Sequence, residues 1–135
     1  MIKRKLFPLL FVTILAALTL LTACGAPADT VVEIQHNISV DEAYEMVENG
    51  VFVLDVRTPA EWNDFHVEGS ALIPHDRISE FLGEIPMDED VLLYCRSGNR
   101  SSQALQVLLD AGYTNVYNML GGMNEWTAAG YPIDQ

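Results

Sequence analysis

Short apolar runs alternate with helix-start signals along most of the chain. The runs at residues 51–54 and 91–94 are apolar throughout, which is typical of strands that are covered on both faces. Further strands are predicted at residues 31–34, 71–73 and 116–119, where shorter runs occur. Because strands and helices alternate over short connections, the pattern predicts a single α/β domain with a mostly parallel sheet and helices on both faces.

The starts of the helices are marked by capping residues. Ser or Thr followed three positions later by Glu is a capping box, which begins a helix, and this spacing occurs at residues 39–42 and 58–61. The first of these helices is expected to end at about Asn49, before Gly50. Other helices are predicted at residues 78–82, from about 101 to 111, and after Gly121-Gly122.

The first 23 residues have the composition of a secretory signal. Three cations at residues 3–5 precede an uncharged run at residues 6–21, which is shorter than the roughly 20 residues that a membrane-spanning helix needs. The segment 21–24, with the sequence LTAC, resembles the bacterial lipobox, in which the cysteine is lipidated before cleavage. An ordinary signal peptide and an uncleaved N-terminal anchor are the alternatives.

We therefore predict an exported lipoprotein that is anchored in the bacterial cell envelope through lipid on Cys24. Residues 1–23 are expected to be removed as the signal peptide. Residues 24–37 are expected to hold the lipidated cysteine, a linker and the first strand, and residues 38–135 to form the folded domain. A chain of 135 residues fits one domain, and we expect a monomer.

The charge of the chain excludes one class of partner. The sequence has 7 Lys+Arg against 19 Asp+Glu. Three of the cations and none of the acids lie in residues 1–23, so the expected mature chain has a net charge of −15. Nucleic-acid binding needs clustered cations and is excluded. Anionic lipid headgroups would also be repelled, so membrane attachment would depend on the lipid on Cys24.

The loop after residue 94 concentrates the features that activate a thiol. Cys95 ends an apolar strand and is the one thiol left once Cys24 is lipidated, so no intramolecular disulfide is expected. Small residues let loop amides turn inward as an anion nest, and the next helix presents its positive end. Each feature favours the thiolate of Cys95. The loop consists of Arg96, Ser97, Gly98, Asn99 and Arg100.

This arrangement predicts a nucleophilic thiolate beneath a cradle for a small anion. Half of the four cations expected in the mature chain lie within five residues of Cys95. The alternative is a buried core cysteine beside two solvated arginines.

Five motifs occur in the order found in single-domain rhodanese proteins, and the chain from about Ile38 to Pro132 resembles that family. The resemblance implies a five-stranded parallel sheet and a thiosulfate sulfurtransferase in which Cys95 takes up a sulfane sulfur as a persulfide and passes it to cyanide or a thiol. Phe65 and Glu68 depart from the family's pattern within a structural turn. The motifs are DVRTPAEW at 55–62, HVEGSA at 66–71 with Ile73-Pro74, CRSGNRS at 95–101, GY at 112–113 with NVYN at 115–118, and Gly121-Gly122 with Trp126.

The resemblance also implies roles for the loop. The amides of residues 96–100 would hold the oxygens of a small anionic sulfur donor, and Arg96 and Arg100 would attract the dianion. The scheme requires no metal and no cofactor, and the histidines lack metal-ligand spacing.

Asp55 and Arg57 follow a strand that should end near this loop. Asp55 could accept hydrogen bonds from the loop while Arg57 adds positive potential. In the alternative, both residues are structural and Arg57 reaches Glu61, four positions further on. His66 is interpreted as structural rather than as a general acid–base group.

Two other functions compete with an enzyme that transfers sulfur. A persulfide carrier would hold sulfur on Cys95 for a membrane-associated partner without independent turnover. A Cys-dependent phosphatase or arsenate reductase would also use a thiolate in an anion loop. Those families place an arginine six positions after the cysteine, where this chain has Ser101.

Overall fold

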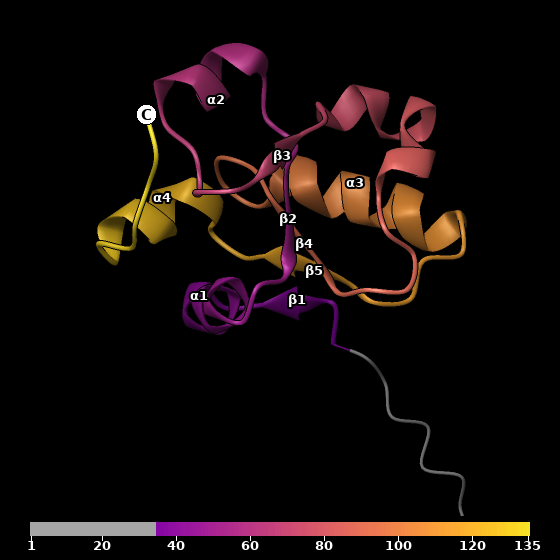
Figure 1. Cartoon of the computed structure of the whole chain (residues 1–135), viewed down its shortest axis with the longest axis horizontal. Helices are drawn as coiled ribbons and strands as arrows, with labels where there is room; N and C mark the ends of the chain where they lie inside the picture. Colours follow the sequence, from indigo (N-terminus) through magenta and orange to yellow (C-terminus); the bar gives the residue numbers. More distant parts are fainter. Residues whose placement is uncertain (1–34) are drawn as a thin grey trace, which may run out of the picture. The chain divides into compact units, whose positions relative to one another are not determined.

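The computed structural model describes residues 35–135, which contain one five-stranded sheet. The strand order is β1-β5-β4-β2-β3 and every pair is parallel, so the predicted α/β class is confirmed (Figure 1). The elements are β1 (Asn37–Ile38), α1 (Val40–Glu48), β2 (Phe52–Asp55), α2 (Pro59–Asp64), β3 (Ala71–Leu72), η1 (His75–Glu80), η2 (Leu82–Glu84), β4 (Val91–Tyr94), α3 (Asn99–Asp110), β5 (Val116–Met119) and α4 (Gly122–Ala128).

Several expectations concern the chain before residue 35. The signal segment 1–23, lipidation of Cys24 and the strand predicted at 31–34 all lie outside the described residues. Within residues 35–135, no helix combines the length and apolar character needed to cross a membrane.

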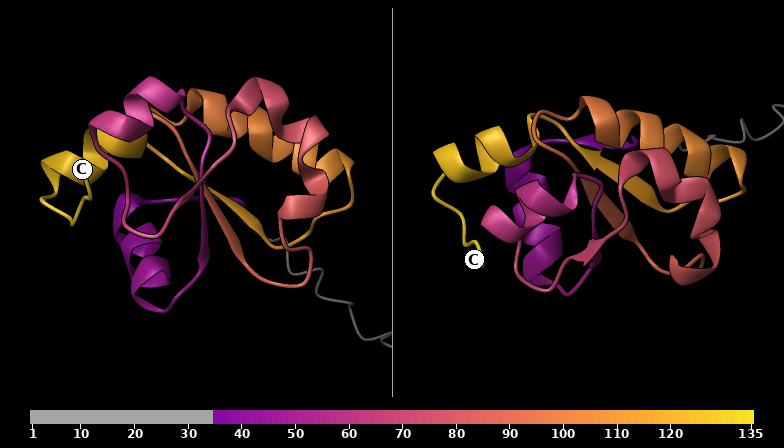
Figure 2. Two further views of the ribbon diagram at one scale, coloured as in Figure 1. Left: turned by 45° about the horizontal axis from the view of Figure 1, so that its top comes forward. Right: turned by 90° about the horizontal axis from the view of Figure 1, so that it is seen from above.

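Helices cover both faces of the sheet because its central strands are apolar on both sides. In β4, Val91 and Leu93 pack toward α3 and η1, whereas Leu92 and Tyr94 pack toward α1 and α4. Successive side chains of a strand point to opposite faces, so one apolar run supplies both cores. The two views in Figure 2 show α1 and α4 on one side of the strands and α3 on the other.

The helix starts follow the caps that the sequence carries. Ser39 and Thr58 each accept a hydrogen bond from the backbone of the Glu three positions later, and both capping boxes are complete. Gly50 follows α1 with a φ of +81°, the left-handed conformation expected after a helix end.

Two predicted helices differ from the structure. Residues 75–84 form two short 3₁₀ helices instead of one helix at 78–82, and neither has a side-chain cap. Short connectors commonly take the 3₁₀ form. α3 begins at Asn99, two residues earlier than predicted, because Gly98 adopts a φ of +93° and its carbonyl already accepts from Ser102 N at 3.0 Å.

The sheet brings two predicted site segments to one edge. β2 and β4 are neighbours, and Asp55 pairs in register with Tyr94, the residue before Cys95. The loops after these strands therefore leave the same carboxyl edge, where parallel α/β sheets bind ligands.

Candidate active site

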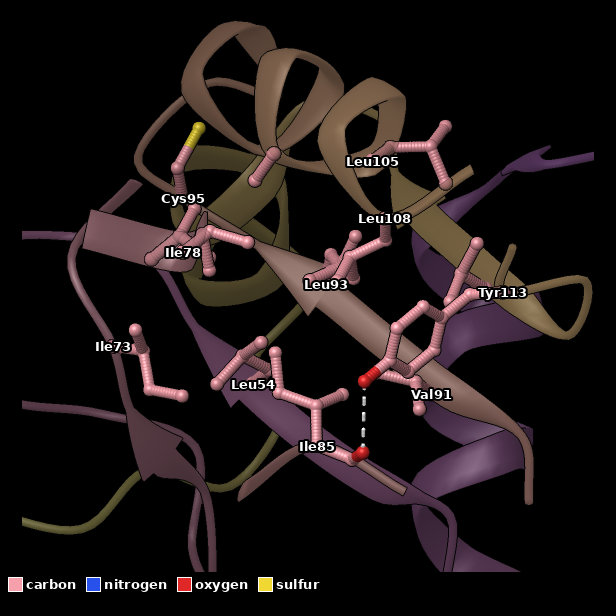
Figure 3. Packing of buried hydrophobic residues seen from close by; sticks show 13 residues of the cluster. Leu54, Ile73, Ile78, Ile85, Val91, Leu93, Cys95, Leu105, Leu108 and Tyr113 are labelled. Atoms are coloured by element: carbon pink, nitrogen blue, oxygen red, sulfur yellow. Dashed lines mark hydrogen bonds between the residues drawn. The ribbon is translucent and has the colours of Figure 1, made fainter. Parts of the chain in front are cut away.

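Cys95 lies at the carboxyl end of β4, beside α3 (Figure 3). Its side chain is almost completely buried, and its Sγ accepts hydrogen bonds from Gly98 N at 3.1 Å and from Ser101 Oγ at 3.3 Å. Such donors stabilise a negative charge on sulfur. The sulfur is therefore held in a cradle of N–H and O–H groups.

Burial and hydrogen bonding act in opposite directions on this thiol. Burial raises the pKa of Cys95, but donors from Ser101, Ser97 and Gly98 outweigh it, and the pKa is lowered from its ordinary value. The Ser101 hydroxyl is the largest of the lowering contributions. The predicted loop of residues 96–100 left this donor out, although its place in the first turn of the next helix could have indicated it.

The predicted loop residues lie around the sulfur in different ways. Gly98 is buried, and its positive φ lets the backbone fold back over Cys95. Ser97 and Asn99 have exposed side chains, and Ser97 contributes through its backbone N–H. Arg96 is exposed and makes no ion pair with the part of the chain that the structure describes.

Arg100 is only partly available to an anion, because it pairs with Glu61 across 39 positions of sequence. Its Nη2 and Nη1 donate to the two carboxylate oxygens at 2.6 and 2.8 Å. The hydrogen bonds from Arg100 lower the pKa of Glu61 to about 2 against the effect of burial. Glu61, together with the nearby Cys95, raises the pKa of Arg100. From the sequence, Glu61 was expected to cap its own helix or to pair with Arg57, and its pairing with Arg100 was not predicted.

The start of α4 supports the loop from the other side. Met123 N donates to Cys95 O at 2.9 Å, and Asn124 N donates to Arg96 O at 3.0 Å. A Cβ at Gly122 would collide with the carbonyl oxygen of Cys95. The glycine pair was predicted only to lead into a helix. The structure gives Gly122 a second role, because it permits this close approach of two backbones.

Asp55 and Arg57 form a buried pair with each other. The Asp55 carboxylate accepts from Arg57 Nε at 2.9 and 3.0 Å and from Nη2 at 2.7 Å, and Arg57 Nη2 also donates to Phe65 O at 2.6 Å. Neither expected contact, Asp55 with the loop or Arg57 with Glu61, is among the hydrogen bonds of the described residues. Asp55 and Arg57 lie at the end of the same strand and pair in bidentate geometry. Because Arg57 is bound to Asp55, the carboxylate of Glu61 pairs with Arg100 instead.

His66 has structural contacts. Its ring stacks on Trp62 with centroids 3.7 Å apart, and Nδ1 lies 3.0 Å from Trp62 O. Its backbone N donates to Asp134 O at 2.9 Å. These contacts hold the end of the chain against α2.

A hollow of about 340 Å³ opens beside the loop, between α2 and α4. Arg57 forms part of its wall, although Arg57 is only 3% exposed. Among residues 35–135, no group of three or more His, Cys, Asp or Glu side chains is placed to hold a metal ion. The lining consists of Arg57, Glu61, Asp64, Phe65, Arg96, Met123, Asn124 and Thr127.

Comparison with known proteins identifies the family of the chain and agrees with its fold. The Rhodanese-like domain family matches residues 39–129, and the chain belongs to that family. It is 42% identical over 83 residues to a sulfurtransferase of Allochromatium vinosum, covering 62% of this chain and 78% of the relative. It is 30% identical over 97 residues to thiosulfate sulfurtransferase GlpE of Pseudomonas aeruginosa, covering 72% and 87%.

A solved structure shows the same architecture. The rhodanese-related protein of Thermoplasma volcanium superposes with a TM-score of 0.68 at 30% identity, covering 74% of this chain and 98% of that one. The single-domain rhodanese resemblance read from the motifs is thereby confirmed.

Proposed function

We propose that this protein is a sulfurtransferase that moves a sulfane sulfur from thiosulfate, or a similar donor, to a thiol or to cyanide. One observation carries the proposal: the buried Cys95 Sγ accepts hydrogen bonds from Gly98 N and Ser101 Oγ and has a lowered pKa. Because its pKa is lowered, a larger fraction of this thiol is ionised at neutral pH than of a free cysteine. The relatives named sulfurtransferases support this assignment.

In the first half-reaction, the Cys95 thiolate attacks the outer sulfur of thiosulfate. A bond forms between Cys95 Sγ and that sulfur, and the S–S bond of thiosulfate breaks with its electron pair leaving on sulfite. The hydrogen-bond donors that surrounded the thiolate then surround the persulfide of Cys95. Exposed Arg96 is suited to attract the dianion and to stabilise the leaving sulfite.

In the second half-reaction, an acceptor thiolate or cyanide attacks the outer sulfur of the persulfide. The S–S bond breaks, its electron pair returns to Cys95 Sγ, and the thiolate is restored. Arg100, partly neutralised by Glu61, keeps a positive charge near the sulfur in both steps. No second cysteine takes part in this scheme.

The test is the intact mass of the purified full-length protein after incubation with thiosulfate. We expect the wild type to gain one sulfur and to lose it when cyanide is added, whereas Cys95→Ser gains none. A wild type that gains no sulfur while Cys95 remains open to alkylation would overturn the assignment of thiosulfate as donor. Persulfide formation without repeated turnover would instead indicate a carrier.

We also propose that the protein is exported and held at a membrane through lipid on Cys24. The cations, the apolar run and the lipobox-like segment at the start of the chain support this, and more than one acyl chain gives stable anchoring. Protein purified from cell membranes is expected to have the mass of residues 24–135 plus acyl chains. The Cys24→Ser variant is expected to retain residues 1–23, and an unlipidated wild type would contradict the proposal.

A further inference from the structure

The carboxylate of Glu61 is held in place by its own helix. Its Oε2 accepts hydrogen bonds from Thr58 N at 3.0 Å and from Thr58 Oγ1 at 2.9 Å, within the capping box that begins α2. The hydrogen bonds from Arg100 lower the pKa of Glu61 to about 2, so the group is ionised throughout the neutral range. Glu61 is therefore a permanent negative charge in a fixed position.

Arg100 uses its donors on this carboxylate and not on the Cys95 sulfur. Nη2 and Nη1 donate to the two oxygens of Glu61 at 2.6 and 2.8 Å. Among the described residues, the hydrogen bonds to Cys95 Sγ come from Gly98 and Ser101 instead. Glu61 and, to a smaller extent, the nearby Cys95 raise the pKa of Arg100. The ion pair therefore lies close to the sulfur, and its two charges largely cancel there.

The arginines near the loop differ in whether an acid neutralises them. Arg57 pairs with Asp55 at 2.7 Å, and Arg100 pairs with Glu61 at 2.6 Å. Of these three arginines, Arg96 alone makes no ion pair with the described residues. Thiosulfate has two negative charges, so one free cation compensates it only in part. The same cation compensates a singly charged donor fully.

We propose that Glu61 sets the charge selectivity for the sulfur donor: by neutralising Arg100, it weakens the preference of the site for a dianion over a monoanion. This inference rests on the sulfur transfer proposed for Cys95. Glu61 acts through Arg100 and is thus a positioning residue. The monoanionic probe is methanethiosulfonate. The Cys95 thiolate forms a bond to its outer sulfur, the S–S bond breaks, and the electron pair leaves on methanesulfinate.

The selectivity is measured as kcat/KM for thiosulfate divided by kcat/KM for methanethiosulfonate, with the full-length protein and cyanide as acceptor. Glu61→Gln removes the charge but keeps a side chain that can complete a capping box. We expect this ratio to rise about threefold, as for one partly exposed charge contact. Because both donors are measured on the same preparation, a change in the folded fraction cancels from the ratio.

The matched control is Glu42→Gln in the other capping box. Glu42 has the same place in α1 that Glu61 has in α2, but it makes no ion pair with the described residues. The two substitutions change the net charge equally, and Glu42→Gln is expected to keep the wild-type ratio. An unchanged ratio in Glu61→Gln, or an equal rise in both variants, overturns the proposal.

A double variant tests whether Glu61 acts by cancelling the charge of Arg100. Arg100→Gln leaves Glu61 without its cation and is expected to lower the ratio. Glu61→Gln combined with Arg100→Gln replaces the ion pair by two neutral side chains, so the net charge beside the sulfur is that of the wild type. Its ratio is therefore expected to equal the wild-type ratio. A double variant as poor as Arg100→Gln alone would overturn the proposal.

Alkylation of Cys95 tests the local charge without any sulfur transfer. The readout is the rate with anionic iodoacetate relative to uncharged iodoacetamide, followed on the Cys95 peptide by mass spectrometry so that Cys24 does not contribute. Glu61→Gln is expected to raise this ratio, and Glu42→Gln to leave it unchanged. If thiosulfate adds no sulfur to Cys95, the proposed activity fails, while alkylation still decides whether Glu61 sets the charge at the sulfur. If the persulfide forms but neither ratio changes in Glu61→Gln, only the role of Glu61 fails.

Discussion

At the scale of single residues, the pKa of the Cys95 thiol depends on a few hydrogen-bond donors, whose effect is opposite to that of burial. Ser101 Oγ and Gly98 N lie 3.3 and 3.1 Å from Sγ. Because a hydrogen bond to the charged form favours it, these donors give the thiol its lowered pKa. The hydroxyl can be removed without changing the backbone, so its effect is measurable by itself.

Ser101→Ala is expected to raise the pKa of the Cys95 thiol, because it removes the hydroxyl hydrogen bond that stabilises the thiolate. The measurement is the pH dependence of Cys95 alkylation by iodoacetamide. The neighbouring exposed residue provides the control, because Ser102→Ala removes a hydroxyl without touching the sulfur. An unchanged profile in Ser101→Ala would refute the assignment.

At the scale of elements, the site depends on contacts between segments that are distant in sequence. Glu61 in α2 accepts from its own helix N-cap and from Arg100 in α3, and the start of α4 bonds to the backbone of the loop. Neither contact follows from the local pattern of its own segment. Each gives a separate prediction.

The pKa of Glu61 makes stability depend on pH. Its folded value of about 2 lies below the ordinary 4.5, so its contribution is fully present above pH 4.5 and is lost as pH falls toward 2. Glu61→Gln is expected to be less stable than the wild type at neutral pH, and the difference should shrink through this window. Urea unfolding at several pH values measures it, and a constant difference would argue against the pair.

Gly122→Ala is expected to destabilise the protein by about 2 kcal/mol or more, for two reasons. Alanine would have to adopt the left-handed conformation, which costs about 1–3 kcal/mol, and its Cβ would collide with Cys95 O. Gly130→Ala separates the two effects. Gly130 also has a positive φ of +77°, but nothing lies within 4 Å of its added Cβ. Urea unfolding should show the larger loss at Gly122, and equal losses would mean that the contact contributes nothing.

At the scale of the whole molecule, the acidic surface opposes the approach of an anionic donor. The chain has 19 Asp+Glu against 7 Lys+Arg, so the long-range field repels thiosulfate although the loop attracts it. At about 0.1 M ionic strength, salt screens interactions between charges that are more than roughly 10 Å apart. As salt is added, the long-range repulsion of the donor therefore weakens more than its short-range attraction near the sulfur.

We expect the rate of persulfide formation by thiosulfate to rise as ionic strength increases from low to moderate values. The control is alkylation of Cys95 by uncharged iodoacetamide, whose rate should not follow the salt concentration. A steady fall in the thiosulfate rate would show that attraction by the loop dominates at long range.

Much of the fold could be predicted from the sequence because the relevant signals are local. The apolar runs placed β2 and β4, and the capping boxes placed the starts of α1 and α2. The motif around Cys95 indicated the thiol and its cradle for the same reason: a strand end, a glycine and a helix start follow one another within a few residues.

The tertiary structure alone decided which side chains meet. It paired Arg100 with Glu61 across 39 positions, turned Asp55 toward Arg57, and packed Gly122 against the backbone of Cys95. It also formed the hollow from three stretches of the chain, residues 57–65, Arg96 and residues 123–127. Hydrophobic periodicity determines which face of an element is buried, but the partner of a polar side chain depends on how loops and helices converge at the sheet edge.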